Sequence, residues 1–342
     1  GLLGGKHPAL SVVPGSTALI VSNDKVAPLY LESLKASLAG ADIHHLILPD
    51  GESFKTVENW SKIIDKLVQI RATRDATVFT LGGGVIGDMG GFAAASYMRG
   101  INFVQIPTSL LAQVDASVGG KTGVNHTMGK NLVGAFHQPA SVLIDIDTLE
   151  TLPAREFSAG LAEVVKIAAV RDAAFLAWLE NNAEAIMARE PEVLTSMIGR
   201  SVANKADVVA KDEREAGVRA LLNFGHSFAH ALETLTDYQV YLHGEAVSIG
   251  MMVASRLSEL RGLCYPGFTD RLGTLLRSFD LPLELPEDMD TDQILETMKL
   301  DKKVMAGSLR LILVKSAGQG FIDSSSDKIQ IATAINASRT RP

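Results

Sequence analysis

Three histidines lie close together in the sequence, in the segments LLNFGHSFAH (221–230) and LHGEAV (242–247). His226 and His230 are four residues apart on a predicted helix, so their side chains share one face. His243 opens the next predicted helix, with Glu245 two residues later. Two histidines and one carboxylate can hold a catalytic zinc ion with one open position. The segments therefore predict a metal site, and the spacing leaves open whether the second histidine ligand is His230 or His243.

A candidate carboxylate for this site lies in the apolar helical segment GLAEVVKIAAV (160–170). Glu163 and Lys166 are three residues apart there and share a face. One interpretation is a plain ion pair within the helix. The other makes Glu163 the carboxylate ligand of an ion that polarises a hydroxyl or carbonyl oxygen.

The segment GGGVIG (82–87), followed by Asp88, has the spacing G-x-G-x-x-G between a predicted strand and a predicted helix. Such a turn directs backbone N–H groups and the positive end of a helix at a phosphate. A match this short also fits a close helix-to-sheet crossing that requires small residues. The pattern alone leaves the nucleotide site and the packing interpretation both open.

The acidic residue that usually follows this turn by about twenty positions is missing. The loop PDGESFKT (49–56), after the preceding predicted strand, offers Asp50 and Glu52 for ribose hydroxyls and Lys55 for charge. Asn23, at the end of the strand ALIVSN, is placed to reach the adenosine end, because ligands gather at the carboxyl ends of parallel strands. The alternative for residues 49–56 is an ordinary acidic turn.

The segment QVDASVGGKTGVNHTMGKN (113–131) is polar and broken by glycines, which predicts an anion-binding loop rather than core. Its candidate side chains are Asp115, Lys121, Asn125, Lys130 and Asn131. Further basic residues are Lys205, Arg214, Arg219, Lys302 and Lys303, although any one of them is more often a solvated surface charge. Together they indicate an acidic, phosphorylated substrate.

Two kinds of element must position these residues. Five β-branched runs, at 18–23, 44–50, 76–82, 103–108 and 141–147, alternate with helical segments such as 57–70, which predicts a parallel α/β sheet. The later chain is mostly helical, over 159–170, 173–188, 192–211, 223–235 and 244–261, with one clear strand at 309–317 and a loop at 281–290. We expect an α/β nucleotide-binding domain over 1–151 and a helical metal- and substrate-binding domain over 152–342.

The composition and charge of the chain limit the kinds of partner that it can bind. The chain has 342 residues and a net charge of −7, which argues against a nucleic-acid partner, because phosphate backbones select for a basic surface. Its apolar runs are shorter than the roughly 18 residues of a membrane span, and its first residues lack the pattern of a signal peptide. The single cysteine, Cys264, suits a reducing compartment, and we expect a cytoplasmic protein with no membrane partner.

Beyond these short patterns, the chain resembles the 3-dehydroquinate synthases of the sugar-phosphate cyclase superfamily. The segments that carry the likeness, in order, are GGGVIGDMGGFAAASYMRG, IPTSLLAQVDASVGGKTGVNH, GKNLVGAFHQP, TLPAREFSAGLAEVVK, DERE, RALLNFGHSFAHALE, LHGEAV and DKKVMAGSLRLIL. The resemblance implies a Rossmann-like NAD domain, a helical metal domain, and NAD with Zn2+ or Co2+ as cofactors. It also implies that the glycine turn binds the nucleotide.

The resemblance assigns roles to individual residues. It implies that Glu163, His226 and His243 hold the metal and that His230 faces the substrate. The implied NAD contacts are Asp50, Gly51, Glu52, Ser53, Phe54, Lys55, Gly83, Gly84, Val85, Ile86, Gly87, Asp88, Thr108, Ser109, Lys121, Lys130, Thr148, Leu149, Glu150 and Thr151. The implied substrate contacts are Arg99, Asp115, Lys121, Lys130, Asn131, Lys166, Lys205, Arg219, Asn223, His230, and Lys302 or Lys303.

The implied reaction converts 3-deoxy-D-arabino-heptulosonate 7-phosphate to 3-dehydroquinate and phosphate. It proceeds by transient oxidation, phosphate elimination, re-reduction and an intramolecular aldol closure. Two alternative activities are considered. One is another sugar-phosphate cyclase, and the other is a metal- and NAD-dependent polyol dehydrogenase, which would have little use for the predicted anion-binding loop at 113–131. A helix of about a dozen residues carries Arg99 roughly 18–20 Å from the glycine turn. We therefore expect a homodimer in which Arg99 crosses to the neighbouring site.

Overall fold

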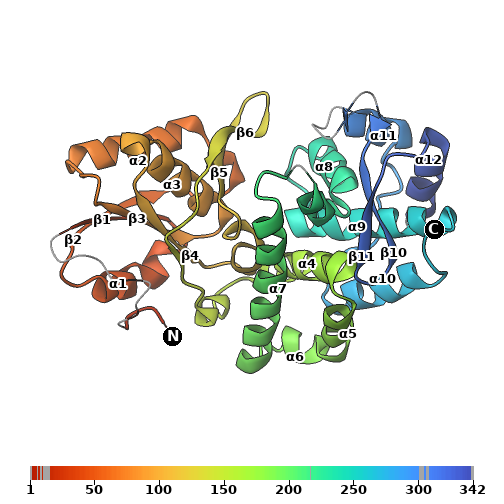
Figure 1. Ribbon diagram of the computed structural model, residues 1–342, viewed down its shortest axis with the longest axis horizontal. Helices are drawn as coiled ribbons and strands as arrows, with labels where there is room; N and C mark the ends of the chain where they lie inside the picture. Colours follow the sequence, from red (N-terminus) through yellow and green to blue (C-terminus); the bar gives the residue numbers. More distant parts are fainter. Residues whose placement is uncertain are drawn as a thin grey trace. The chain divides into compact units, whose positions relative to one another are not determined.

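The computed structural model describes residues 2–5, 7, 10, 16–215, 217–299, 304–305 and 308–339 (Figure 1). The chain forms two compact units, residues 1–152 and residues 153–342, which are described one at a time below. Lys302 and Lys303 lie outside the described residues.

Unit 1 is built on a parallel sheet with the strand order β2-β1-β3-β4-β7. The strands are β1 (Thr17–Asn23), β2 (Asp42–Leu48), β3 (Thr77–Gly82), β4 (Asn102–Pro107) and β7 (Ser141–Val142). Val21 of β1 pairs with Leu46 on one side and Thr80 on the other. The last strand ends earlier than expected, because the chain turns into the 3-10 helix η5 (Ile146–Leu149). The parallel α/β fold predicted from the sequence is confirmed.

Helices cover both faces of this sheet (Figure 1). Leu19 and Val21 face a core shared with α2 (Val57–Gln69) and α3 (Gly84–Ser96). The alternate residues Ala18 and Ile20 face a second core shared with α1 (Ala27–Ser37). Both faces of β1 are therefore apolar, which is why such strands have continuous hydrophobic runs rather than alternating ones.

The segment predicted as an irregular loop, 113–131, is instead mostly regular structure. It contains the short π-helix η4 (Ala112–Ala116) and the strand β5 (Lys121–His126), which pairs antiparallel with β6 (Gly129–Phe136). The prediction that it is too polar for the core is wrong, because Gln113 and Val124 are fully buried. Thr122 and Val124 pack inward on either side of the buried Gly123, with the polar Lys121 and Asn125 flanking them, a pattern that the glycines of the segment masked.

The glycines of α3 perform two tasks along one helix. Gly83 is the N-cap residue, directly after β3. A Cβ atom on Gly90 would lie 2.3 Å from Thr80 Cγ2, and one on Gly91 would lie 2.6 Å from Thr122 Cγ2. The later glycines therefore allow α3 to lie close against β3 and β5. The packing interpretation therefore holds for Gly90 and Gly91. The glycines at the start of α3 remain available to bind a phosphate through their backbone N–H groups.

Unit 2 is mostly helical. Its helices are α4 (Ala154–Arg171), α5 (Ala173–Asn181), α6 (Ala183–Met187), α7 (Pro191–Lys211), η6 (Val218–Asn223), α8 (His226–Leu235), α9 (His243–Leu260), α10 (Phe268–Ser278), α11 (Thr291–Lys299) and α12 (Lys328–Ala337). The predicted helix 173–188 is two helices, and Asn182 separates α5 from α6. The predicted loop 281–290 lies between α10 and α11. No helix in the described ranges has the length and apolar character that crossing a membrane requires.

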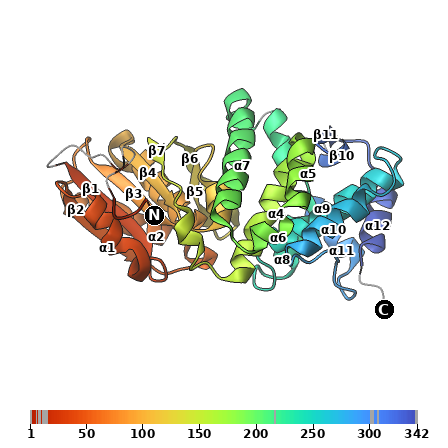
Figure 2. The ribbon, with the colours of Figure 1, turned by 90° about the horizontal axis from the view of Figure 1, so that it is seen from below.

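Unit 2 contains more strands than the single one predicted at 309–317. β10 (Leu311–Ser316) pairs antiparallel with β11 (Gln319–Asp323), and β8 (Val304–Met305) pairs with β9 (Ser308–Leu309). Gly318, with φ of +74°, makes the tight turn between β10 and β11, so the chain reverses immediately. The centre of the unit is formed by α4 and α9, which lie side by side (Figure 1 and Figure 2) and are buried along most of their lengths.

Replacing a glycine by alanine should change the unfolding free energy in opposite directions at two helical positions, one in the close crossing of α3 and one at an open position of α7. Gly90→Ala places a methyl group against the buried Thr80 side chain and should cost about 1–3 kcal/mol of unfolding free energy. Gly199→Ala, within α7, meets nothing within 4 Å and should stabilise the protein by about 0.5–1 kcal/mol. Denaturant unfolding of both variants checks this. Equal effects of the two substitutions would contradict it.

Candidate functional site

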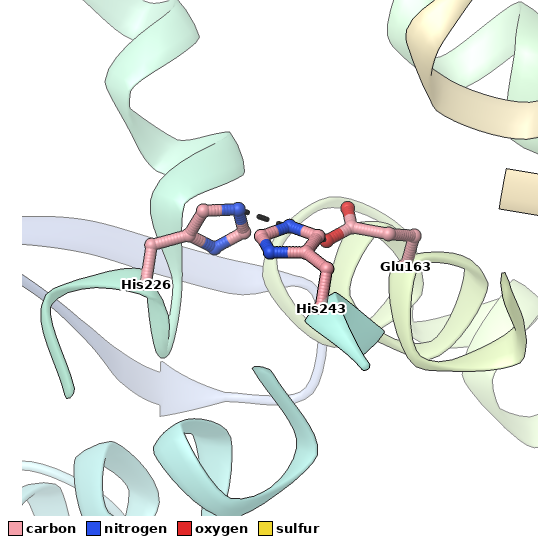
Figure 3. A group of neighbouring side chains, drawn as sticks. All are labelled: Glu163, His226 and His243. Carbon is pink, nitrogen blue, oxygen red and sulfur yellow. Dashed lines mark ion pairs between the residues drawn. The ribbon is translucent and has the colours of Figure 1, made fainter. Parts of the chain in front are cut away.

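Three potential metal ligands come together in unit 2 from three different helices. Glu163 lies in the middle of α4, His226 is the first residue of α8, and His243 is the first residue of α9. One ligand atom from each residue lies within 4.8 Å of the others, and Figure 3 shows the three side chains turned toward one another. The fold therefore joins segments that are far apart in the sequence into one group.

The distances within this group fit an ion better than direct hydrogen bonds. Glu163 Oε1 is 3.6 Å from His226 Nε2 and 3.6 Å from His243 Nε2. Both separations are too long for a hydrogen bond, and this buried oxygen has no hydrogen-bond partner in the described part of the chain. Two ligands that each lie about 2.0–2.1 Å from a tetrahedral zinc ion are about 3.4 Å apart. The residues present therefore fit a divalent metal ion.

Two glycine contacts between helices hold the ligands in place. A Cβ atom on Gly244, directly after His243, would lie 1.8 Å from the backbone oxygen of Ala159 in α4. A Cβ atom on Gly250 would lie 2.2 Å from the backbone oxygen of Gly225, which directly precedes His226. Gly225 has φ of +81°, which side-chain-bearing residues rarely adopt. The three ligand-bearing helices therefore touch backbone to backbone beside the metal ligands.

The groups around the three ligands carry compensating charges. The second oxygen of Glu163 forms an ion pair with Lys166, and both side chains are almost fully buried. His243 Nδ1 is 3.3 Å from Glu233 Oε1. Burial alone would lower the pKa of His243, but the carboxylates of Glu163 and Glu233 raise it to about 10. In the absence of metal this histidine is therefore protonated at neutral pH.

Glu233 is a buried residue of this group that the sequence interpretation did not include. It lies on α8, seven residues after His226. Residues seven apart share one face of a helix, so their spacing was a usable signal. The sequence-based prediction named the histidines, Glu163 and Glu245 but not Glu233.

His230 lies beside the three ligands without joining them. Its ring centroid is 5.5 Å from that of His226 and 6.4 Å from that of His243. The sequence spacing left either His230 or His243 as the second histidine ligand. The geometry groups His243 with Glu163 and His226, and it leaves His230 next to them.

Unit 2 also buries further candidate substrate contacts. Lys205 on α7 and Arg219 on η6 are both buried, and these two elements pack against α4, which carries the buried Lys166. Asn223 donates a hydrogen bond of 2.5 Å from Nδ2 to Glu215 Oε1, a partner that the sequence interpretation did not include. Arg214 is exposed, as expected of a solvated surface charge. Three buried cations in a protein of net negative charge indicate an anionic ligand.

In unit 1, a buried lysine connects the glycine turn to the β5–β6 hairpin. Lys55 Nζ is 2.5 Å from Asp88 Oδ2 and 2.7 Å from Asn131 Oδ1. Burial would lower the pKa of Lys55, but Asp88 and Glu52 outweigh it and raise the pKa. Lys55 is therefore charged, and it ties the first turns of α3 to the hairpin.

The acidic loop after β2 is held by amide side chains. Asn23 Nδ2 donates to Asp50 Oδ1 at 2.6 Å, and Asn125 Nδ2 donates to Glu52 Oε1 at 2.8 Å. The candidate residues at the ends of β1 and β2 thus contact each other directly. The loop is more than an acidic surface turn, because its carboxylates are fixed by β1 and by the hairpin.

The remaining sequence-predicted residues of unit 1 occupy a few defined places. Thr108 and Ser109 follow β4, and the Thr108 amide donates to the backbone oxygen of Gly82 at 3.1 Å. Thr148 and Leu149 end η5, and Thr151 Oγ1 is 2.5 Å from the Tyr30 hydroxyl. The others lie in or beside η2 (Glu52–Phe54), the first turns of α3, η3 (Tyr97–Arg99), η4, the hairpin and the end of η5: Gly51, Ser53, Phe54, Gly84, Val85, Ile86, Gly87, Arg99, Asp115, Lys121, Lys130 and Glu150.

Comparison with known proteins identifies relatives over almost the whole chain. Residues 45–159 match the N-terminal region of the 3-dehydroquinate synthase family, and residues 160–304 match its C-terminal region. A 3-dehydroquinate synthase of Hydrogenovibrio crunogenus is 53% identical over 94% of this chain and 90% of its own length.

Solved structures agree with this relationship. A 2-epi-5-epi-valiolone synthase from Streptomyces hygroscopicus, with NAD+ and Zn2+ bound, is 32% identical, with a TM-score of 0.89 over 96% of this chain and 92% of its own. A 2-deoxy-scyllo-inosose synthase in complex with carbaglucose-6-phosphate, NAD+ and Co2+ is 25% identical, with a TM-score of 0.85 over 98% and 95% of the two chains.

The ligand geometry predicts which substitutions abolish metal binding. Alanine at Glu163, His226 or His243 removes one of three ligand atoms, and each variant should lose stoichiometric zinc when purified without excess metal. His230→Ala should retain one zinc per chain and lose activity. Elemental analysis of the four purified proteins provides the measurement. A His230 variant without metal, beside a His243 variant that keeps it, would contradict the assignment.

Proposed function

The chain belongs to the 3-dehydroquinate synthase family, and we propose that Glu163, His226 and His243 form its metal centre. The enzyme is a lyase that converts 3-deoxy-D-arabino-heptulosonate 7-phosphate to 3-dehydroquinate and phosphate. The observation that carries the proposed centre is the buried Glu163 Oε1, which lies 3.6 Å from two imidazole nitrogens and has no hydrogen-bond partner among the described residues.

The cofactors that suit these residues are NAD and a divalent metal ion. When bound, they supply a reversible hydride acceptor and a Lewis acid. The N-terminus of α3 offers backbone N–H groups to the cofactor's phosphates, and the fixed carboxylates of Asp50 and Glu52 suit ribose hydroxyls. Lys55 joins these two elements, which supports a preformed nucleotide site.

The buried cations of unit 2 suit a substrate that carries a carboxylate and a phosphate. Lys166, Lys205 and Arg219 come from elements that pack together, and each is at most 6% exposed. Their charges are desolvated, so they attract an anion more strongly than surface lysines do. We assign them to substrate binding, together with Asn223 and with Lys121, Lys130, Asp115 and Asn131 of unit 1.

The residues near the ligands have distinct tasks. Lys166 forms an ion pair with one oxygen of Glu163, which leaves Oε1 as the oxygen that would hold the metal ion. His230, beside the ligand histidines, is placed to contact the substrate and to hold or move a proton there. The reaction needs no covalent nucleophile, so the protein acts mainly by positioning the substrate and stabilising charge.

Sequence identity favours 3-dehydroquinate synthase activity over the activities of related cyclases. The chain is 53% identical to the 3-dehydroquinate synthase above, and 32% and 25% identical to the cyclases that form valiolone and inosose products. The basic residues of both units also argue against a polyol dehydrogenase, whose substrate has no phosphate. We also infer that the enzyme is cytoplasmic, which suits its single buried, unpaired cysteine, Cys264.

We further propose a homodimer in which Arg99 serves the partner's site. The helix α3 has thirteen residues and so spans about 20 Å from the glycine turn. Arg99 lies just beyond its end, exposed, next to Met98, whose side chain is 43% exposed. Arg99 is thus remote from the turn in its own chain, and its exposure with an apolar neighbour suits a contact between copies.

The proposed reaction predicts that NAD is regenerated within each turnover. With the heptulosonate phosphate, NAD and zinc, phosphate should be released in many-fold excess over bound NAD, together with 3-dehydroquinate, while NADH does not accumulate. Phosphate, product and absorbance assays on one sample measure all three. Stoichiometric NADH build-up would favour the dehydrogenase, and phosphate release with a different cyclic product would favour another cyclase.

A mixing experiment tests the role of Arg99. Subunits with Arg99→Ala are combined with subunits carrying His226→Ala, and exchange is verified with distinguishable tags. Each heterodimer should contain one site with an intact metal centre and a borrowed arginine, so the mixture should recover up to about a quarter of wild-type activity by random pairing. If exchanged mixtures never exceed the activity of the separate mutants, Arg99 does not act across the interface.

A further inference from the structure

The two histidines of the proposed metal centre use their ring nitrogens in the same way. In each, Nε2 faces Glu163 Oε1 at 3.6 Å, and Nδ1 faces away from it toward a second partner. His226 Nδ1 is 3.4 Å from the backbone oxygen of Phe224, and His243 Nδ1 is 3.3 Å from Glu233 Oε1. A proton on Nδ1 leaves the lone pair of Nε2 free to bind a metal ion.

We propose that Glu233 is a positioning residue that fixes the ring orientation and tautomer of His243 for metal binding. The inference rests on the proposed metal centre and extends it by one residue that does not itself touch the metal. A carboxylate that accepts a hydrogen bond from the outer nitrogen of a metal-bound histidine also strengthens that histidine as a ligand.

The packing explains why His243 needs this support more than His226. The His226 side chain is 11% exposed, so its neighbours restrict the ring, whereas the His243 side chain is 34% exposed. A fixed partner on Nδ1 supplies the restraint that packing does not.

Glu233 is well placed to be that partner. Its side chain is 7% exposed, and it lies on α8, the helix that also carries the ligand His226. The helices α8 and α9 pack against each other, so Glu233 links a ligand on one to a ligand on the other. A buried carboxylate is costly unless it is paired, and the contact with His243 Nδ1 offsets part of that cost, to which a bound metal ion would add.

A purely structural role for Glu233 predicts a different result. Loss of a buried acid that only supports packing changes the unfolding free energy and leaves the metal affinity of the folded protein unchanged. Measurements of metal affinity and of the ligand field of a bound ion therefore distinguish a positioning role from a packing role. Neither measurement requires substrate or turnover.

The test compares Glu233→Gln with a matched control, Glu259→Gln. Glu259 lies on α9 with His243 and accepts a hydrogen bond of 2.7 Å from the Thr269 amide, but it is sixteen residues further along, about 24 Å away. Zinc dissociation constants are measured by competition with a chromophoric chelator, and the visible spectrum is recorded with cobalt. Glu233→Gln should bind zinc about 10–100-fold more weakly with a changed cobalt spectrum, while Glu259→Gln should match the wild type.

Each outcome decides between the roles. Wild-type zinc affinity and cobalt spectrum in folded Glu233→Gln, or an equal loss in Glu259→Gln, would overturn the inference. If Glu233→Gln does not fold, Glu233→Asp is measured in the same way, because the shorter side chain withdraws the carboxylate from Nδ1 and should also weaken zinc binding. Wild-type values in that variant would overturn the inference too. A wild-type protein that binds neither zinc nor cobalt would instead refute the proposed metal centre.

Discussion

The contact of helix backbones at small residues is the constraint on which the metal-binding unit depends. Gly244 lies against Ala159, and Gly250 lies against Gly225, with no room at either glycine for a Cβ atom. Each contact is one residue from a histidine ligand or one helical turn from the glutamate ligand. Backbone atoms cannot move aside as side chains do, so the separation of α4, α8 and α9 is set at the point where the ligands must converge.

Charge balance is the second requirement of this interior. Glu163 and Glu233 bring two negative charges into a buried site, and Lys166, Lys205 and Arg219 bring three positive charges into the same unit. None of these groups would be stable alone in so apolar a surrounding, and each has partners or a place for a ligand. Opposite charges are therefore buried together in this unit, so each group offsets part of the cost of burying the others.

Much of this arrangement could be predicted from the sequence, and the failures have physical causes. The parallel sheet and the helical second half follow from hydrophobic periodicity. The residue types mark the histidines and Glu163 as candidate ligands, while the grouping of Glu163 with His226 and His243 was implied by the family resemblance alone. Helical spacing could not choose between His230 and His243, because the decision depends on how α9 packs against α4. The β5–β6 hairpin was mistaken for a loop because its glycines hid the inward alternation of Thr122 and Val124. Glu233 was missed because its significance lies in its contact with another helix.

The sheet of unit 1 ends in two edges that discourage strand addition. At one edge, β7 has only two residues and so offers few free backbone groups. At the other, β2 carries Asp42 and His44, whose side chains lie 3.0 Å apart, and Pro49 follows the strand. Charged side chains, a proline and short length each hinder the edge-to-edge pairing that leads to aggregation. Self-association of this unit by adding a strand to its sheet is therefore disfavoured at both edges.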